Sequence, residues 1–228
     1  HATVLSGQTW NADYPGYAQS ELEKKFPGAV ALFWAGCGGD QNPVPRRELS
    51  LAQAYGADLA ARVGDVLRAH MPELSPTLAI SYRIIEAPLD TLPTREEVQA
   101  NLASKNRFEI ARAKYLLHKF EEKGGLEGAY PYPIGSWTLG NEIDFVFLGG
   151  EVVVDYALRL KRERRGTKTW VAAYSNDVMA YIPSLRVLRE GGYEGGLSNV
   201  YYGLPALWHE TVEEVIVKNV HETAPTKP

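Results

Sequence analysis

The chain has 228 residues, of which 45% are hydrophobic and 23% charged, and its net charge is −4. This composition is typical of a folded globular protein and excludes a chain that is mainly disordered. The small negative charge excludes a general positive field for nucleic acid. The single cysteine excludes an internal disulfide, and no apolar run is long enough to span a membrane.

The chain begins with His1 and shows neither an initiator methionine nor a signal peptide. We therefore expect part of the protein, with any targeting signal, to lie outside this chain.

Segments with strand and helix patterns alternate along the sequence. In chain order we expect a loop at 1–17, a helix at 20–26, a buried strand at 29–35, a helix at 50–71, a strand at 77–87, a helix at 94–122, an irregular segment at 126–140, a strand at 143–148, a helix at 155–164, a strand at 169–174 and a helix at 204–220. Thr94 and Glu97 are spaced as a capping box. This order predicts an α/β fold with mixed β-sheet layers flanked by helices.

Three of the predicted strands run directly into polar loops that contain glycine or turn residues. These loops are residues 36–43, 149–151 and 174–183. Ligands of open α/β sheets bind beyond the carboxyl ends of strands. We therefore expect the functional site at these strand ends.

Several residues of these loops suit either chemistry or plain structure. Glu151 follows two glycines after an apolar strand, so its carboxylate is either paired, bound to a metal or favoured by the start of a helix. Tyr181 ends a turn-like stretch and could be a packed aromatic residue. Tyr193 lies between two pairs of glycines, where its hydroxyl could face a ligand. Cys37 is expected to be a small buried residue rather than a nucleophile.

Familiar catalytic motifs are absent from the sequence. It contains no HExxH pair, no G-x-S-x-G elbow, no Walker A loop and no Rossmann fingerprint.

The order of the weaker signals resembles the neutral/alkaline (non-lysosomal) ceramidase family. The stretch 175–184 is similar to that family's Asn-Asp-Tyr-x-x-Tyr segment, and Tyr193 begins a Tyr-Glu-Gly block 12 residues after Tyr181. Gly150-Glu151 resembles a Gly-Glu turn of the family. Further similarities are a His-containing turn and a Gly-Asp-x-x-Gly-Tyr-like stretch at 1–3 and 11–18, and a Gly-Asp-x-Ser-Pro-Asn loop at 36–43.

The resemblance implies a zinc-dependent hydrolase of an N-acyl (amide) bond in a lipid-like substrate, acting through metal-activated water. Carried over to this sequence, His1, Glu151 and Tyr181 are zinc ligands, and Tyr193 hydrogen-bonds at the reacting carbonyl. Imidazole nitrogen and hard oxygen ligands suit Zn²⁺, and a tyrosine hydroxyl can donate to a developing oxyanion. The resemblance further implies that residues 1–228 are the C-terminal half of the catalytic domain of a secreted or periplasmic enzyme.

The chain departs from the family pattern at two points. A further histidine ligand of the family lies in an N-terminal half that is absent from this chain, so activity is expected to require that half as a partner. Asn42 occupies the position of the family's serine and cannot act as a nucleophile. Asn42 therefore supports an alternative, a non-catalytic ceramidase-like binding or scaffold domain. Another alternative is a copper protein in which His1 is a true N-terminus, but the expected helices and the single cysteine disfavour it.

Overall fold

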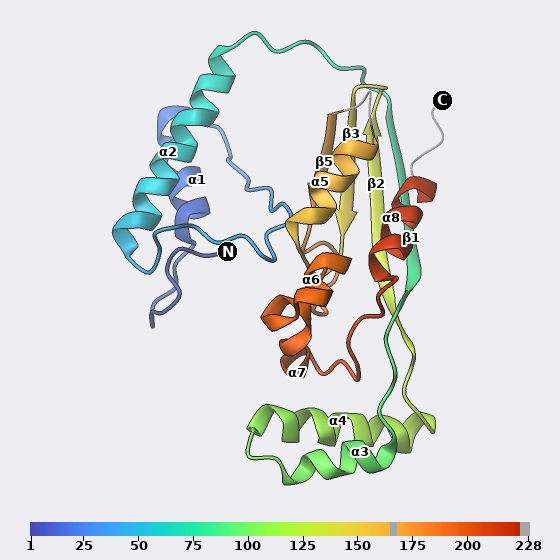
Figure 1. Ribbon diagram of the computed structural model, residues 1–228. Helices are drawn as coiled ribbons and strands as arrows, with labels where there is room; N and C mark the ends of the chain where they lie inside the picture. Colours follow the sequence, from blue (N-terminus) through green and yellow to red (C-terminus); the bar gives the residue numbers. More distant parts are fainter. Residues whose placement is uncertain (165–167, 224–228) are drawn as a thin grey trace. The chain divides into compact units, whose positions relative to one another are not determined.

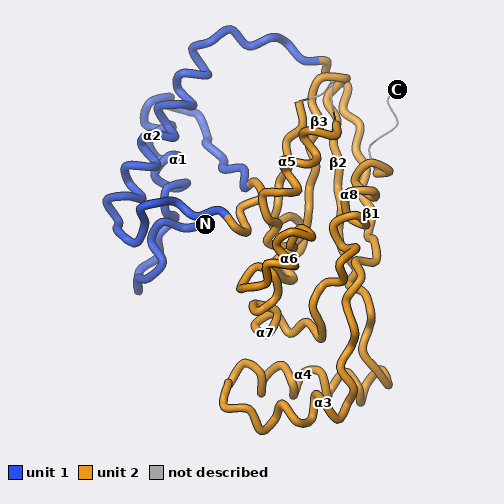
Figure 2. Tube along the Cα trace, viewed as in Figure 1, with its two compact units in different colours: residues 1–35, 41–74 blue, residues 36–40, 75–228 orange. Residues whose placement is uncertain are grey.

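The computed structural model describes residues 1–164 and 168–223. The chain divides into two compact units (Figure 2). Unit 1 comprises residues 1–35 and 41–74, and unit 2 comprises residues 36–40 and 75–228. The short loop 36–40 therefore belongs to unit 2, although the chain on both sides of it belongs to unit 1.

Unit 1 is a pair of packed helices, α1 (Asp13–Lys25) and α2 (Leu49–Arg68) (Figure 1). The helices approach closely at Gly56, where an added side-chain carbon would lie 2.4 Å from the Cβ atom of Tyr17. The helix predicted at 50–71 is confirmed by α2. The boundary predicted between a loop at 1–17 and a helix at 20–26 is wrong, because α1 begins at Asp13. Its start is fixed locally, since the Asp13 amide donates to Asn11 Oδ1 at 2.6 Å.

The buried strand predicted at 29–35 is wrong. This segment has no regular secondary structure and is part of neither sheet among the described residues, and Val30 and Leu32 are 80% and 87% exposed. An apolar run favours burial, but a strand also needs a neighbouring strand to pair its backbone groups. Without such a neighbour, the apolar run alone does not produce a strand.

Unit 2 is built on a mixed four-stranded sheet. Its order is β1 (Leu78–Pro88), β2 (Ala129–Leu139), β3 (Ile143–Leu148) and β5 (Lys168–Ala172). The first three strands pair antiparallel, and β3 pairs parallel with β5. The predictions of strands at 77–87, 143–148 and 169–174 are confirmed, within two residues at each boundary.

The irregular segment predicted at 126–140 is wrong, because most of it forms β2. Pro131 and Pro133 lie opposite β1, whereas pairing with β3 begins only at Ile134. A proline has no N–H to donate, so it is tolerated where one side of the strand has no partner strand. The prolines and glycines that suggested a loop are thus compatible with this strand.

Two helices cover one face of the sheet, α5 (Val154–Glu163) against β5 and α8 (Val212–Thr223) against β1 and β2 (Figure 1). Fully buried side chains between these layers are Tyr132, Ile134, Val146, Leu148, Tyr156, Leu160, Ile216 and Val220. Alternate residues on the opposite face of β1 are exposed, from Leu78 to Ile84. The predicted α/β fold, a mixed sheet flanked by helices, is confirmed.

The helix predicted at 204–220 begins later than expected, at Val212. The indole of Trp208 donates to the Tyr181 carbonyl at 2.8 Å, and the His209 amide donates to the Pro88 carbonyl at 3.0 Å. A continuous helix would orient the Trp208 side chain and the His209 amide differently, so these long-range hydrogen bonds would not form. Residues before Val212 therefore form a connection that packs against the sheet.

The helix predicted at 94–122 is two helices, α3 (Arg95–Ala100) and α4 (Arg107–Lys123), joined by a 3₁₀ turn, η1 (Asn101–Ala103). The predicted capping box of Thr94 is present, with both of its hydrogen bonds to Glu97. Asn106 caps α4 by accepting from the Phe108 amide at 2.9 Å, and such local side-chain caps compete with continuous helix.

The remaining elements follow the carboxyl ends of β3 and β5. They are β4 (Glu151–Val152), β6 (Tyr181–Ile182), α6 (Leu185–Glu190), a single π-helical turn η2 (Tyr193–Leu197) and α7 (Asn199–Tyr202). In the part of the chain that the structure describes, no helix combines the length and apolar character needed to cross a membrane.

Candidate functional site

Glu151 is positioned by a glycine turn at the end of β3. Gly150 has a φ of 78°, and an added side-chain carbon there would lie 2.5 Å from Ile182 Cγ1. Only glycine allows this turn, which leads directly into β4. The Glu151 amide donates to the Ala180 carbonyl at 2.8 Å, and β4 pairs parallel with β6. This pairing places Glu151 directly beside Tyr181.

Tyr181 arrives from the other side, through the turn that follows β5. Asn176 in this turn has a φ of 68°, a conformation that asparagine tolerates better than most residues. The Asp177 carbonyl accepts from the Gly150 amide at 2.8 Å, so the two glycine- and asparagine-containing turns are tied together. Trp208 then holds the Tyr181 carbonyl at 2.8 Å. The backbone on both sides of the Glu151–Tyr181 pair is thus fixed.

Three tyrosine side chains gather around Glu151. The Tyr181 hydroxyl hydrogen-bonds with the Glu151 carboxylate, and the Tyr202 hydroxyl donates to Glu151 Oε1 at 2.5 Å. The rings of Tyr193 and Tyr202 lie edge-on to Tyr181, at centroid distances of 5.4 Å and 6.4 Å. Tyr181 is buried, whereas Tyr193 is 46% exposed. The cluster therefore presents a carboxylate and phenol oxygens beside a tyrosine that solvent can reach.

The environment keeps these tyrosines protonated at neutral pH. Burial, followed by the charge of Glu151 and its hydrogen bond, raises the pKa of Tyr181 well above its usual value. Burial and the hydrogen bond to Glu151 raise the pKa of Tyr202. Burial, with Tyr201 and Glu151 nearby, also raises the pKa of Tyr193. Each hydroxyl is therefore a hydrogen-bond donor at pH 7 in the metal-free chain.

The glycine-rich loop at 36–40 lies along the backbone of the same site. The Gly39 amide donates to the Val152 carbonyl at 2.9 Å, and Asp40 Oδ1 accepts from the Val154 amide at 2.8 Å. An added side-chain carbon at Gly39 would lie 2.6 Å from the Glu151 carbonyl oxygen, so this approach requires glycine. Cys37 in this loop is buried as expected, and burial raises the pKa of its thiol to about 12. The loop thus supports the Glu151 strand.

His1 and Asn42 belong to unit 1. The amino group of His1 donates to the carbonyl of Gln41 at 2.7 Å, which places the first residue beside the neighbour of Asn42. The Asn42 side-chain oxygen accepts from the Arg46 guanidinium. The structure thus brings Glu151, Tyr181 and Tyr193 together within unit 2. It brings His1 and the segment of Asn42 together within unit 1.

Tyr202 is a member of this cluster that the sequence motifs did not indicate. It follows Tyr193 by nine residues, in a short helix with no recognisable motif. Only the fold shows that its hydroxyl reaches Glu151. Within residues 1–164 and 168–223, no group of three or more His, Cys, Asp or Glu side chains is close enough to hold a metal ion. The described hydrogen-bond partners of the Glu151 carboxylate include the hydroxyls of Tyr181 and Tyr202.

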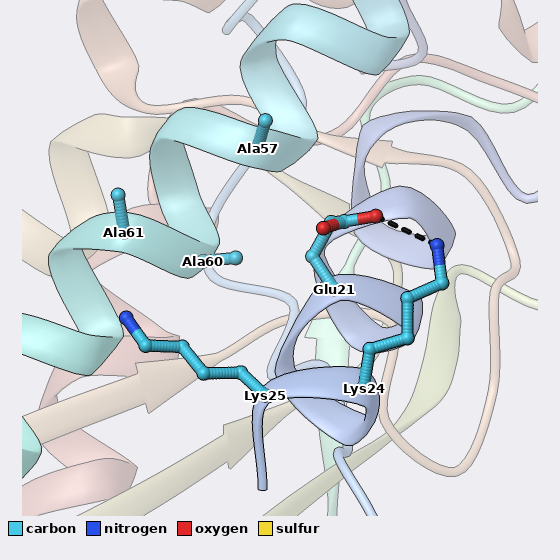
Figure 3. A pocket seen from close by; sticks show the side chains of 6 residues that line it. All are labelled: Glu21, Lys24, Lys25, Ala57, Ala60 and Ala61. Atoms are coloured by element: carbon cyan, nitrogen blue, oxygen red, sulfur yellow. Dashed lines mark hydrogen bonds and ion pairs between the residues drawn. The ribbon is translucent and has the colours of Figure 1, made fainter.

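The pocket shown in Figure 3 is separate from the predicted site residues. It has a volume of about 400 Å³ and lies between α1 and α2 of unit 1. Its lining residues are Glu21, Lys24, Lys25, Ala57, Ala60 and Ala61. Glu21 and Lys24 form an ion pair at 2.8 Å. None of the predicted ligands or catalytic residues lines this pocket.

Comparison with solved structures gives two similar folds. A neutral ceramidase from Pseudomonas aeruginosa has a TM-score of 0.65 and 16% sequence identity, and the match covers 98% of this chain and 42% of that one. A ceramidase complexed with C2 has a TM-score of 0.65 and 14% identity, with coverage of 100% and 45%. No protein-family model and no curated protein sequence matches the chain.

The chain therefore spans less than half the length of the ceramidase structures that it resembles. At this level of identity the comparison concerns the fold. The fold expected from the order of the sequence motifs is confirmed: the described residues have a fold similar to that of part of a neutral ceramidase.

Proposed function

We propose that this chain is part of a zinc-dependent hydrolase that cleaves an N-acyl (amide) bond, with a ceramide-like lipid as substrate. The observation that carries the proposal is the convergence of Glu151, Tyr181 and Tyr193 in one cluster. The three residues come from separate segments of the chain, and the order of the sequence motifs predicts the same three residues. The fold similarity to ceramidases supports the same reading.

The oxygen atoms of Glu151 and Tyr181 are suitable ligands for a zinc ion. A carboxylate and a phenol oxygen are hard ligands of the kind that Zn²⁺ accepts together with imidazole. We assign Glu151 and Tyr181 as ligands from unit 2 and His1 as a ligand from unit 1. A further histidine would come from polypeptide outside residues 1–228. When bound, zinc would activate a water molecule and polarise the amide carbonyl.

Tyr193 is suited to act on the substrate itself. Its ring rests against Tyr181 at 5.4 Å, and almost half of its surface is exposed. Because its pKa is raised by burial and neighbouring groups, its hydroxyl is protonated at neutral pH. A protonated, preorganised hydroxyl can donate to the oxygen that becomes negative when the carbonyl is attacked. Tyr181, against which this ring rests, is buried, and Glu151 is half-buried.

Asn42 favours a second candidate, a ceramidase-like domain that binds its ligand without cleaving it. Its side-chain amide cannot act as a nucleophile, and its oxygen already accepts a hydrogen bond from Arg46. In the hydrolytic proposal Asn42 has no nucleophilic role, because attack comes from activated water. The two candidates therefore differ in turnover and not in metal binding.

Metal analysis of point variants tests the proposal. We expect the wild-type protein to bind one zinc ion, and Glu151→Ala and Tyr181→Phe to lose most of it while remaining folded. Glu142→Ala and Tyr82→Phe are matched controls, because both residues are exposed and lie outside the cluster. Wild-type zinc content in both site variants would contradict the ligand assignment.

A hydrolysis assay separates the two candidates. Release of a fluorescent fatty acid from an N-acyl sphingosine, lost in the Glu151→Ala variant, supports the hydrolase. Zinc binding without any release, in a preparation that also contains the polypeptide supplying the second histidine, supports the binding domain.

A further inference from the structure

Tyr202 makes a short hydrogen bond with the side chain of Glu151. Its hydroxyl donates to Glu151 Oε1 at 2.5 Å, which is the distance range of a charge-assisted O–H···O⁻ hydrogen bond. We propose that Tyr202 is a positioning residue, which holds the Glu151 carboxylate in one orientation beside Tyr181. This inference rests on the proposed function, because it assigns Glu151 a ligand role.

The helix that carries Tyr202 is itself held firmly. Asn199 at the start of α7 is buried, and its Nδ2 atom donates to the Ala206 carbonyl at 3.2 Å. The helix ends at Gly203, whose φ of 77° closes it with a hydrogen bond to the Asn199 carbonyl at 3.1 Å. Both ends of this short helix are therefore fixed, so the Tyr202 hydroxyl has a defined position.

The ring of Tyr202 is also constrained by packing. It lies edge-on to Tyr181 at 6.4 Å and packs against the core of unit 2. Tyr202 also lines a cavity of about 190 Å³, together with Tyr115 and Leu204. A ring held in this way loses little rotamer freedom when its hydroxyl binds a carboxylate, so the hydrogen bond is preorganised.

Tyr181 and Tyr202 therefore have different tasks, although both contact Glu151. Tyr181 is paired with Glu151 in backbone register and is the assigned ligand. If its oxygen turned toward a metal ion, its hydrogen bond to Glu151 would be given up. Tyr202 would then be the phenol that still orients the carboxylate. Outer-shell hydrogen bonds of this kind tune metal affinity, and their loss typically weakens binding about 10–100-fold.

Zinc affinity provides the first test, with Tyr201→Phe as the matched control. Tyr201 is the preceding residue in the same helix and is 51% exposed. We expect Tyr202→Phe to bind zinc about 10–100-fold more weakly than wild type in a competition titration with a chelating dye. Tyr201→Phe should bind within about twofold of wild type. Equal affinities in Tyr202→Phe and wild type would overturn the inference.

A metal-free double-mutant cycle provides the second test. Urea unfolding midpoints are measured with a chelator present for wild type, Tyr202→Phe, Glu151→Ala and the double variant. We expect Tyr202→Phe to lower the midpoint in the wild-type background and to have little effect once Glu151 is alanine. Additive shifts would overturn the inference. Failure of the proposed function gives a different result from failure of this inference. In that case wild-type protein would bind no zinc, even in the presence of the polypeptide that supplies the further histidine ligand.

Discussion

The predicted metal site falls into two regions that are fixed by different means. In unit 2, Glu151 and Tyr181 are placed by strand register. Hydrogen bonds also hold the backbone on both sides of this pair. In unit 1, His1 lies at the end of an irregular segment that is held by a few hydrogen bonds. From this difference we infer that the pairing of β4 with β6 preorganises the predicted ligands of unit 2. The ligand from unit 1 depends on how well a short terminal segment is anchored.

The largest effect is expected from His1, which tests whether unit 1 contributes to the same site as Glu151. Loss of an imidazole ligand should weaken zinc binding by more than the ~100-fold upper range of an outer-shell change, so we expect His1→Ala to lose nearly all affinity. Its amino group keeps the hydrogen bond to Gln41, so the fold of unit 1 should persist. His70→Ala is the control, because His70 is exposed at the end of α2. Unchanged affinity in His1→Ala would separate the two regions.

Tyr193 should affect turnover and not metal content. Removal of one oxyanion donor typically lowers kcat about 10²–10³-fold, so Tyr193→Phe should be nearly inactive in the N-acyl sphingosine assay. Its zinc content should equal that of wild type, because the described contact of Tyr193 with Tyr181 is between their rings. Tyr82→Phe serves as the control for turnover. A parallel loss of zinc in Tyr193→Phe would make this residue a ligand and would change the division of roles within unit 2.

Sequence patterns predicted those helices and strands whose local sequence signals agree with the contacts that they make in the fold. The amphipathic spacing of α2, the alternation of β1 and the capping box of Thr94 are all present in the structure. The strand β2 was missed because Pro131 and Pro133 signal a loop, whereas the register of the sheet leaves them opposite β1 alone. The prediction of a strand at 29–35 is wrong for the opposite reason. The apolar pattern of this segment is that of a strand, but no described strand pairs with it.

The same distinction applies to the site. Motif order predicts Glu151, Tyr181 and Tyr193 as candidate site residues, and the structure places these three side by side. It could not identify Tyr202, because a hydrogen bond between residues 51 positions apart leaves no local pattern. Zinc binding and the roles of His1 and Asn42 stay predictions that rest on the resemblance.

Asp13 gives a way to sharpen the comparison from the side of unit 1. Its carboxylate accepts hydrogen bonds from the amides of Thr3, Val4 and Tyr14 at 2.8–2.9 Å, so it anchors the segment that carries His1. Burial raises its pKa, but the backbone hydrogen bonds outweigh burial, and the net pKa is lowered. The anchoring is therefore fully present above about pH 4, the usual pKa of aspartate, and is lost as pH falls through the lower folded value.

Hydrogen exchange at the Thr3 and Val4 amides measures this anchoring. We expect Asp13→Asn to reduce their protection by about 1.5–3 kcal/mol, the range for hydrogen bonds to a charged group. Asparagine also tolerates the φ of 54° at this position, so the start of α1 should be retained. The protection in wild type should fall below pH 4, and that in the variant should be flat. Equal pH dependence in both proteins would show that another group anchors the segment.

The smallest effect is expected from Tyr130, which supports unit 2 from outside the cluster. Its hydroxyl donates to Asp177 Oδ2 at 2.8 Å, in the turn that leads to Tyr181. Tyr130→Phe should lower the free energy of unfolding by about 0.5–1.5 kcal/mol and leave zinc affinity unchanged, because the backbone of that turn is also held by Gly150. Burial and the hydrogen bond to Asp177 raise the pKa of Tyr130 to about 12. A raised pKa stabilises the fold below the unfolded value near pH 10, so the difference between wild type and variant should vanish as pH rises toward 12. Urea unfolding at pH 8, 10 and 11 measures it. A fall in zinc affinity in Tyr130→Phe would instead show that the preorganisation of Tyr181 depends on this side chain as well as on strand register.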